Sequence, residues 1–257
     1  MTAAAPRVTS LTGTRRGSGP ALVLLHALGT DHRMWDPVLD RLAAERDVWA
    51  LDLPGFGGSP AAEGSAAPRA LAEAVAAHLA GAGVEVPHVA GNSLGGWVAL
   101  ELALAGHAAS VTAIAPAGLW PEPLTPKRSV ARALARAALP VLGPLLDTER
   151  GRRLAFATSA VHAGRIPAEA ARHLVRAYAT APGFDAANDA MRTSRFSELA
   201  RVPVPVTLAW PEHDRLVTRP RALPPGVRSV DLPGCGHLPT WDDPELVARV
   251  LLEGSAG

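Results

Sequence analysis

The sequence contains a single cysteine, Cys235, among its 257 residues. One thiol cannot form a disulfide within the chain, and the composition fits a reducing compartment. The longest apolar stretches are interrupted by Arg, Pro or His well before the ~20 residues that a membrane span needs. The first residues lack the apolar segment of a secretory signal, so we expect a cytoplasmic protein.

The sequence also has no excess of charge of either sign, because it contains 25 Lys and Arg and 24 Asp and Glu, a net charge of +1. This balance gives no electrostatic reason to expect nucleic acid or an anionic membrane as a partner. We expect a small-molecule substrate and a monomer or homodimer. Residues 127–153 are locally basic, and we interpret them as a solvated helical face. The nine histidines show neither His-x-His nor His-Glu-x-x-His spacing, so we expect no metal site.

Apolar runs alternate with helical patterns along most of the chain. The pattern predicts strands over residues 21–26, 48–52, 86–92 and 111–115, with helices over 34–45, 68–79 and 97–105 between them. Residues 7–11 are a candidate edge strand, followed by a loop over 13–19. Strands return at 204–210 and 227–232, and a helix over 244–253 ends the pattern. Such alternation predicts an α/β fold with a mostly parallel sheet and helices on both faces.

The alternation stops between residues 121 and 197. This region holds four helix-like runs (129–139, 148–158, 168–178 and 185–195), and prolines 140, 144, 167 and 182 fall in the loops between them. We interpret residues 121–197 as a helical cap, or lid, inserted into a core domain made of residues 1–120 and 198–257. A short helix is also expected over residues 219–223.

The central strand leads into Gly91-Asn92-Ser93-Leu94-Gly95, and a helix follows directly. This order predicts a sharp turn that forces Ser93 toward positive φ, with Gly91 and Gly95 at positions where a Cβ would meet neighbouring backbone. Such a turn places the serine hydroxyl at the N-terminus of a helix, where negative charge is favoured. Ser93 is therefore a candidate nucleophile.

A serine hydroxyl needs a base to remove its proton, and the base needs an acid to orient it. His237 follows the last predicted strand, and Asp214 follows the one before it. The carboxyl ends of parallel strands share one edge, so both side chains should lie on the same edge as Ser93. Glu212 is the competing acid, and Asp214 is favoured because it lies deeper in its loop.

An acyl-transfer site also requires hydrogen-bond donors for the oxyanion of the tetrahedral intermediate. The N–H of Leu94 directly after Ser93 is one candidate, and the N–H of Leu28 after the first buried strand is the other. Substrate contacts are expected at His26, Trp120 and Leu238. Met34 and Trp35 near the oxyanion loop, together with Trp120 and Leu238, suggest an apolar acyl or alcohol site.

Together these segments resemble the signature blocks of the α/β-hydrolase superfamily, over nearly the whole chain outside the insertion. The resemblance implies an eight-stranded sheet, a helical cap after strand six and a serine mechanism without a cofactor. It assigns the nucleophile, acid, base and oxyanion positions to Ser93, Asp214, His237 and the backbones of Leu28 and Leu94. The blocks that carry it are Leu25-His26-Ala27-Leu28-Gly29, Asp52-Leu53-Pro54-Gly55-Phe56-Gly57-Gly58-Ser59, Gly91-Asn92-Ser93-Leu94-Gly95-Gly96, Glu212-His213-Asp214-Arg215-Leu216-Val217 and Gly236-His237.

The resemblance predicts a hydrolase of small carboxylic esters, with two alternatives. The Gly-Asn-Ser-x-Gly-Gly turn is similar to that of carbon–carbon bond hydrolases of meta-cleavage pathways. Those hydrolases hold their substrate with an arginine of the cap, and Arg192 or Arg195 would take that role here. Those hydrolases usually place a tryptophan after the histidine, where this chain has Leu238. A non-catalytic binding protein of the same fold is the second alternative, and the intact set of catalytic groups disfavours it.

Overall fold

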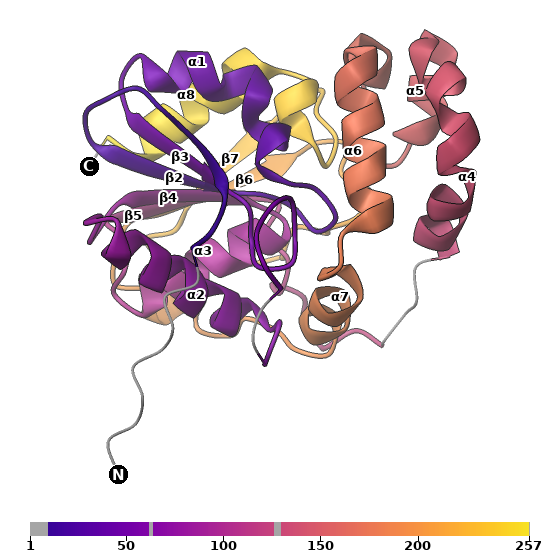
Figure 1. The fold of residues 1–257 in the computed structure, drawn as a ribbon. Helices are drawn as coiled ribbons and strands as arrows, with labels where there is room; N and C mark the ends of the chain where they lie inside the picture. The colour runs from indigo at the N-terminus through magenta and orange to yellow at the C-terminus, as the bar shows by residue number, and fades with distance from the viewer. Residues whose placement is uncertain (1–9, 62–63, 126–129, 257) are drawn as a thin grey trace.

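The computed structural model describes residues 10–61, 64–125 and 130–256. Its centre is a seven-stranded sheet in the order β1-β3-β2-β4-β5-β6-β7 (Figure 1). Only β1 runs antiparallel to its neighbour, and all other pairs are parallel. The strands are β1 (Gly13–Arg16), β2 (Ala21–Leu25), β3 (Asp47–Leu51), β4 (His88–Asn92), β5 (Ser110–Ile114), β6 (Val206–Pro211) and β7 (Arg228–Leu232).

Helices cover both faces of the sheet. Figure 1 shows α1 (Asp36–Ala43) and α8 (Pro244–Gly254) on one face, and α2 (Pro68–Gly81) and α3 (Leu94–Leu104) on the other. β3, β5 and β6 are buried at every position, which explains why most of their residues are apolar. α8 begins at Pro244 after its N-cap Asp243, whose carboxylate accepts the N–H of Leu246. The predicted parallel sheet between two helical layers is confirmed.

The described residues contain seven strands rather than the eight that the resemblance implied. Residues 7–9 of the predicted edge strand lie outside the described part, and the edge strand β1 instead occupies Gly13–Arg16, where a loop was expected. β1 has no apolar alternation to reveal it. Polar contacts to β3 accompany its backbone pairing: Arg15 forms an ion pair with Asp47 at 2.8 Å and stacks on Trp49.

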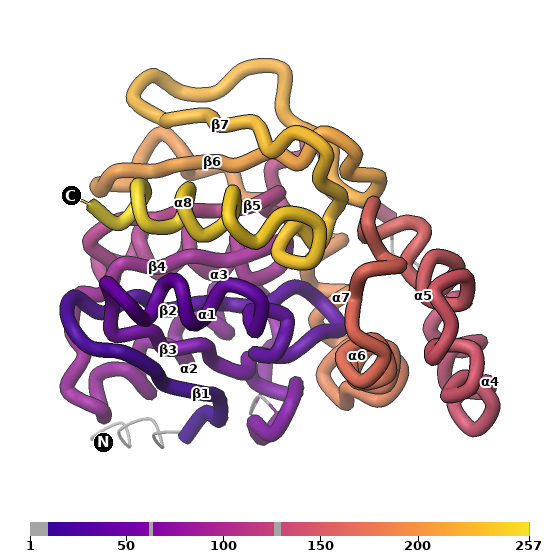
Figure 2. The backbone as a smooth tube through the Cα atoms, turned by 90° about the horizontal axis from the view of Figure 1, so that it is seen from above, coloured from indigo at the N-terminus to yellow at the C-terminus, as the bar shows by residue number. Residues whose placement is uncertain are grey.

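Four helices lie between β5 and β6, where the helical insertion was expected. They are α4 (Val130–Asp147), α5 (Glu149–Ala155), α6 (Ala168–Thr180) and α7 (Phe184–Arg192). Figures 1 and 2 show them at one end of the sheet, with α4 and α5 outermost. Short 3-10 turns complete the fold: η1 (His32–Trp35), η2 (Ala163–Arg165), η3 (Leu199–Arg201) and η4 (Pro239–Trp241).

Prolines account for two differences between the predicted and the observed helices. α4 continues through Pro140 and Pro144, which were expected in a loop. Each proline removes one backbone donor, and both side chains are exposed, so the freed carbonyls can be hydrated. Conversely, no helix forms over residues 219–223. Pro220 and Pro224 restrict the residue before each of them to extended backbone. None of the described helices is long and apolar enough to cross a membrane.

Candidate active site

Ser93 occupies the turn between β4 and α3 with φ 55° and ψ −113°, far from the conformations that side chains favour. A Cβ on Gly91 would lie 2.2 Å from the carbonyl oxygen of Gly95, and one on Gly95 would lie 2.2 Å from that of Leu25. These contacts explain why both flanking positions are glycine. Ala115, at the end of the neighbouring strand β5, also has positive φ, so backbone strain collects at this edge.

Asp214 and His237 meet beyond the ends of β6 and β7. The Nδ1 atom of His237 lies 2.7 Å from Oδ2 of Asp214, and both side chains are almost fully buried. The other carboxylate oxygen, Oδ1, accepts the N–H groups of Leu216 and Val217. Glu212 instead is exposed and accepts the N–H of Gly234. The structure therefore pairs His237 with Asp214 rather than with the competing acid.

The pKa of Asp214 reflects these contacts. Burial alone raises it, but the hydrogen bond and charge of His237, with the N–H groups of Leu216 and Val217, lower the pKa below its ordinary value. Asp214 is therefore an anion at neutral pH. A carboxylate at Nδ1 fixes the imidazole tautomer that leaves Nε2 as the base.

The loop that carries His237 contacts the 3-10 turn that follows β2. The hydroxyl of Thr240 donates to the carbonyl of Met34 at 2.9 Å, and the Met34 sulfur lies 3.2 Å from the backbone nitrogen of Ala27. In the sheet, β4, which leads into Ser93, lies between β2 and the strands β6 and β7 that precede the acid and the base. Among the described residues no hydrogen bond joins the Ser93 hydroxyl to His237. Their direct contact stays a prediction.

The two candidate oxyanion donors flank this turn. The N–H of Gly95 donates to the carbonyl of His26 at 3.1 Å, so the loop after β2 is tied to the start of α3. Within the described part of the chain, the N–H groups of Leu28 and Leu94 donate to no other residue. Their role as oxyanion donors stays a prediction.

His26, expected to contact substrate, has a different position. It is completely buried, its Nε2 accepts the N–H of Leu53, and its Nδ1 donates to the carbonyl of Ala27. Burial lowers the pKa of His26, so the ring is neutral. With both nitrogens engaged, His26 holds the loop that carries Leu28, and the prediction of a substrate contact is corrected.

Trp120 and Leu238 lie where the inserted helices meet the core. The indole N–H of Trp120 donates to the carbonyl of Ser194, and its ring packs edge-on against Trp97. The N–H of Leu238, directly after His237, donates to the carbonyl of Ser159 at 2.7 Å. Both residues thus join the inserted segment to the core, and their contact with a substrate stays a prediction.

Sequence reasoning missed the aromatic pair Tyr178 and Phe184, whose rings meet edge-on at 5.3 Å. A Cβ on Gly29, next to Leu28, would lie 2.7 Å from Tyr178 and 2.9 Å from Phe184. The end of α6 and the start of α7 therefore press on the loop that carries a candidate oxyanion donor. No sequence signal distinguishes these aromatics from other helical core residues.

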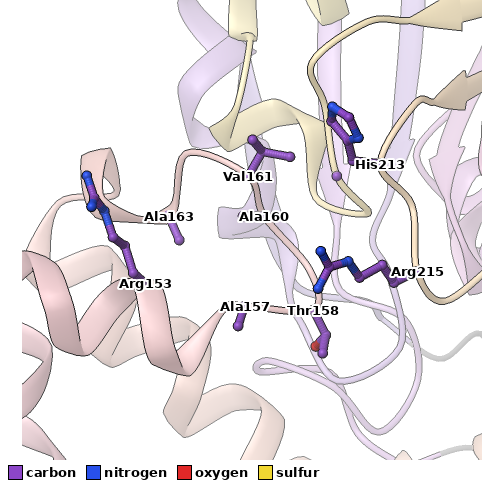
Figure 3. Close-up of a pocket in the computed structure, with 9 residues that line it drawn as sticks. Arg153, Ala157, Thr158, Ala160, Val161, Ala163, His213 and Arg215 are labelled. Atoms are coloured by element: carbon purple, nitrogen blue, oxygen red, sulfur yellow. The ribbon is translucent and has the colours of Figure 1, made fainter.

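A cavity of about 380 Å³ opens between the inserted helices and the loops of the acid and base (Figure 3). Gly236, directly before His237, and both neighbours of Asp214, His213 and Arg215, form one wall. Arg153 and the segment after α5 form the other. The cavity therefore borders the two loops that carry Asp214 and His237.

One group of described side chains has metal-ligand spacing: Asp31, His32 and Asp52 offer ligand atoms within 4.8 Å of one another. Hydrogen bonds within the protein already use these atoms. His32 Nδ1 lies 2.8 Å from Asp52, and Asp31 lies 2.5 Å from Nε2 of His173 on α6. We assign no metal to this group, which instead joins the loop after β2 to its surroundings.

Comparison with known proteins decides the family. The model of the alpha/beta hydrolase family matches residues 22–250. The chain belongs to the α/β-hydrolase family. It is 33% identical over 196 residues to the epoxide hydrolase EphH of Mycobacterium tuberculosis, covering 70% of this chain and 91% of that protein. It is also 46% identical to the pimeloyl-[acyl-carrier protein] methyl ester esterase of Aeromonas hydrophila, but only over 96 residues, 37% of this chain and 36% of the esterase.

Solved structures of this α/β-hydrolase fold match almost the whole chain. A membrane phospholipase A, described as a bacterial virulence factor, is 28% identical with a TM-score of 0.72, covering 94% of this chain and 81% of that one. The enol-lactonase of Burkholderia xenovorans is 20% identical with a TM-score of 0.73, covering 95% and 94%. The latter similarity establishes the fold alone. The named relatives are hydrolases, and the chain is an enzyme of this family.

Proposed function

We propose that the enzyme cleaves small, apolar carboxylic esters through an acyl-enzyme on Ser93. The observation that supports this most is the 2.7 Å hydrogen bond between His237 and Asp214, at the sheet edge where Ser93 stands in a strained turn. A buried histidine–carboxylate pair near a serine in a strand-to-helix turn is the arrangement that nucleophilic catalysis requires.

In this mechanism Nε2 of His237 removes the Ser93 proton as the hydroxyl oxygen attacks the ester carbonyl. The N–H groups of Leu28 and Leu94 stabilise the resulting oxyanion. His237 then protonates the departing alcohol, leaving the acyl group on Ser93. Water, deprotonated by the same imidazole, attacks the acyl-enzyme and releases the acid. Asp214 stays ionised throughout and stabilises the imidazolium.

The chemistry of Ser93 favours ester cleavage over epoxide opening, the activity named for the Mycobacterium relative. Attack of a serine on an epoxide carbon would form an alkyl ether, which water does not cleave under physiological conditions. Attack on an ester gives an acyl-enzyme, which water does cleave. Esterase names among the relatives agree with this preference, although the esterase match covers little more than a third of the chain.

We further propose that residues 121–197 act as a cap and that Tyr178, Phe184 and Leu238 border an apolar acyl or alcohol site. Tyr178 and Phe184 press on Gly29 beside Leu28, and Leu238 follows His237. Ser93 and His237 are only 6% and 5% exposed, so this arrangement favours compact substrates.

The test is hydrolysis of p-nitrophenyl esters of increasing chain length by the wild type and by Ser93→Ala. We expect rates highest for short acyl chains and reduced about a thousandfold or more by Ser93→Ala. Ser197→Ala, which changes an exposed serine, is the matched control and should keep full activity. Esterase activity retained by Ser93→Ala would remove Ser93 from the mechanism. Faster cleavage of a ring-fission diketone than of any ester would favour the carbon–carbon alternative.

A further inference from the structure

Exposed apolar side chains concentrate on the inserted helices. Nine large hydrophobic residues of the described chain are exposed, and seven of them lie between residues 121 and 197, which make up less than a third of the sequence. They are Leu124, Val130, Leu134, Val141, Leu145, Leu154 and Val161. Scattered exposed leucines need no explanation, but a concentration on one segment does.

The exposed face of α4 is almost entirely apolar. Up to Leu145 it presents one charged side chain, Arg136, among alanines, prolines and large aliphatic residues. Val130, Leu134, Val141 and Leu145 follow helical spacing along it, and Leu134 and Val141 are 65% and 72% exposed. Figures 1 and 2 show α4 at the outer end of the molecule, with α6 between it and the sheet. The outer face of α4 is thus exposed, as the interpretation of residues 127–153 as a solvated face implies, but it is apolar rather than charged.

Although the net charge of the chain is near zero, the inserted segment and the rest of the chain carry opposite net charges. Residues 121–197 contain twelve Lys and Arg and six Asp and Glu, a net charge of +6, which leaves −5 for the remaining chain. On α4 and α5 both acids are already paired, Asp147 with Arg172 and Glu149 with Arg153. Arg136 and Arg150 have no acidic partner in the described structure. The apolar face is thus bordered by positive charge that nothing on these helices neutralises.

We propose that the outer face of α4 and α5 docks on an anionic lipid surface. An exposed helix with an apolar face and unpaired arginines matches the physical requirements of a helix that lies in a membrane interface. Self-association through this face would bring two positively charged segments together, and repulsion between them opposes it. The inference departs from the expectation that no membrane is involved, because that expectation used the net charge of the whole chain.

The test is flotation of the full chain with vesicles of phosphatidylcholine alone or mixed in equal parts with phosphatidylglycerol. We expect binding to the mixed vesicles that weakens as salt is added. The double variant Leu134→Glu and Val141→Glu should reduce partitioning at least about tenfold, since it removes apolar area and adds charge. Arg136→Glu should reduce it about fivefold or more.

Two variants on the core serve as matched controls. Val86→Glu changes another exposed aliphatic residue, 56% exposed before β4, and Arg249→Glu reverses an exposed charge on α8. Both should bind vesicles as the wild type does, and all variants should keep the wild-type melting temperature. Equal binding of the double variant, or no binding of the wild type to anionic vesicles, would overturn the proposal. A dimer that the double variant dissociates, without vesicle binding, would assign the face to self-association instead.

Discussion

The strained backbone of Ser93 makes a prediction about stability that is independent of any substrate. Replacing Ser93 by Ala removes the hydroxyl but keeps the Cβ and therefore the strain. Replacing it by Gly removes the Cβ as well, so the same turn forms without the steric conflict. Both variants are inactive in the proposed mechanism, and their difference in unfolding free energy reports the strain.

The magnitude follows from three terms. A non-glycine residue at φ 55° and ψ −113° lies outside even the left-handed helical region, so we assign the upper end of the strain range, about 3 kcal/mol. Glycine gives back about 0.8 kcal/mol through the larger entropy of its unfolded chain. Loss of one buried carbon costs about 0.8 kcal/mol more. Ser93→Gly should therefore be about 1.5 kcal/mol more stable than Ser93→Ala.

The assay is thermal unfolding of both variants and of the wild type under identical conditions. For a chain of this size the difference corresponds to a melting temperature about 3–6 °C higher for Ser93→Gly than for Ser93→Ala. Denaturant titration should give the same order with unchanged slope. Equal or lower stability of Ser93→Gly would show that the turn stores no such strain, and the argument for a functionally enforced conformation would fail.

Further predictions concern Asp214, Gly95 and Cys235. Asp214→Asn should reduce kcat about ten-thousandfold in the ester assay, because the amide favours the wrong imidazole tautomer. The folded-state pKa of Asp214 lies below its unfolded value of 3.8, so the stability it contributes is complete above that pH and is lost as pH falls through the folded value. Unfolding measured from pH 6 downward should therefore show a flatter curve for Asp214→Asn. Gly95→Ala should fail to accumulate as folded protein by circular dichroism, since the new Cβ would lie 2.2 Å from the Leu25 carbonyl. Cys235 is fully buried, and burial with the nearby carboxylates Asp242, Asp243 and Glu212 raises its pKa to about 12, so iodoacetamide should label it only after unfolding.

The sequence predicted the parts of the fold that depend on local chemistry. Apolar-rich runs indicated six strands, and three of these, β3, β5 and β6, are buried at every position. The turn at Ser93 was also predictable, since the need for glycine at two flanking positions is a local steric requirement. The pairing of His237 with Asp214 followed from the rule that parallel strands end at one edge.

Other features depend on contacts between distant segments, which periodicity does not encode. β1 is polar and exposed, and Arg15 contacts Asp47 on β3. His26 is a positioning residue because Leu53, after a different strand, donates to its ring. The contact of Tyr178 and Phe184 with Gly29 depends on how the inserted helices pack on the core. The sequence therefore predicted the hydrolase family, whereas the packing of the inserted helices on the core could not be derived from it.

The most direct test of the proposed acyl-enzyme is reaction of the native protein with a fluorophosphonate, followed by mass spectrometry of the peptides. Ser93, activated by His237, should carry the label, and neither Ser93→Ala nor His237→Ala should react at a comparable rate. Ester hydrolysis by a protein whose Ser93 stays unlabelled, or labelling that persists without His237, would contradict the mechanism.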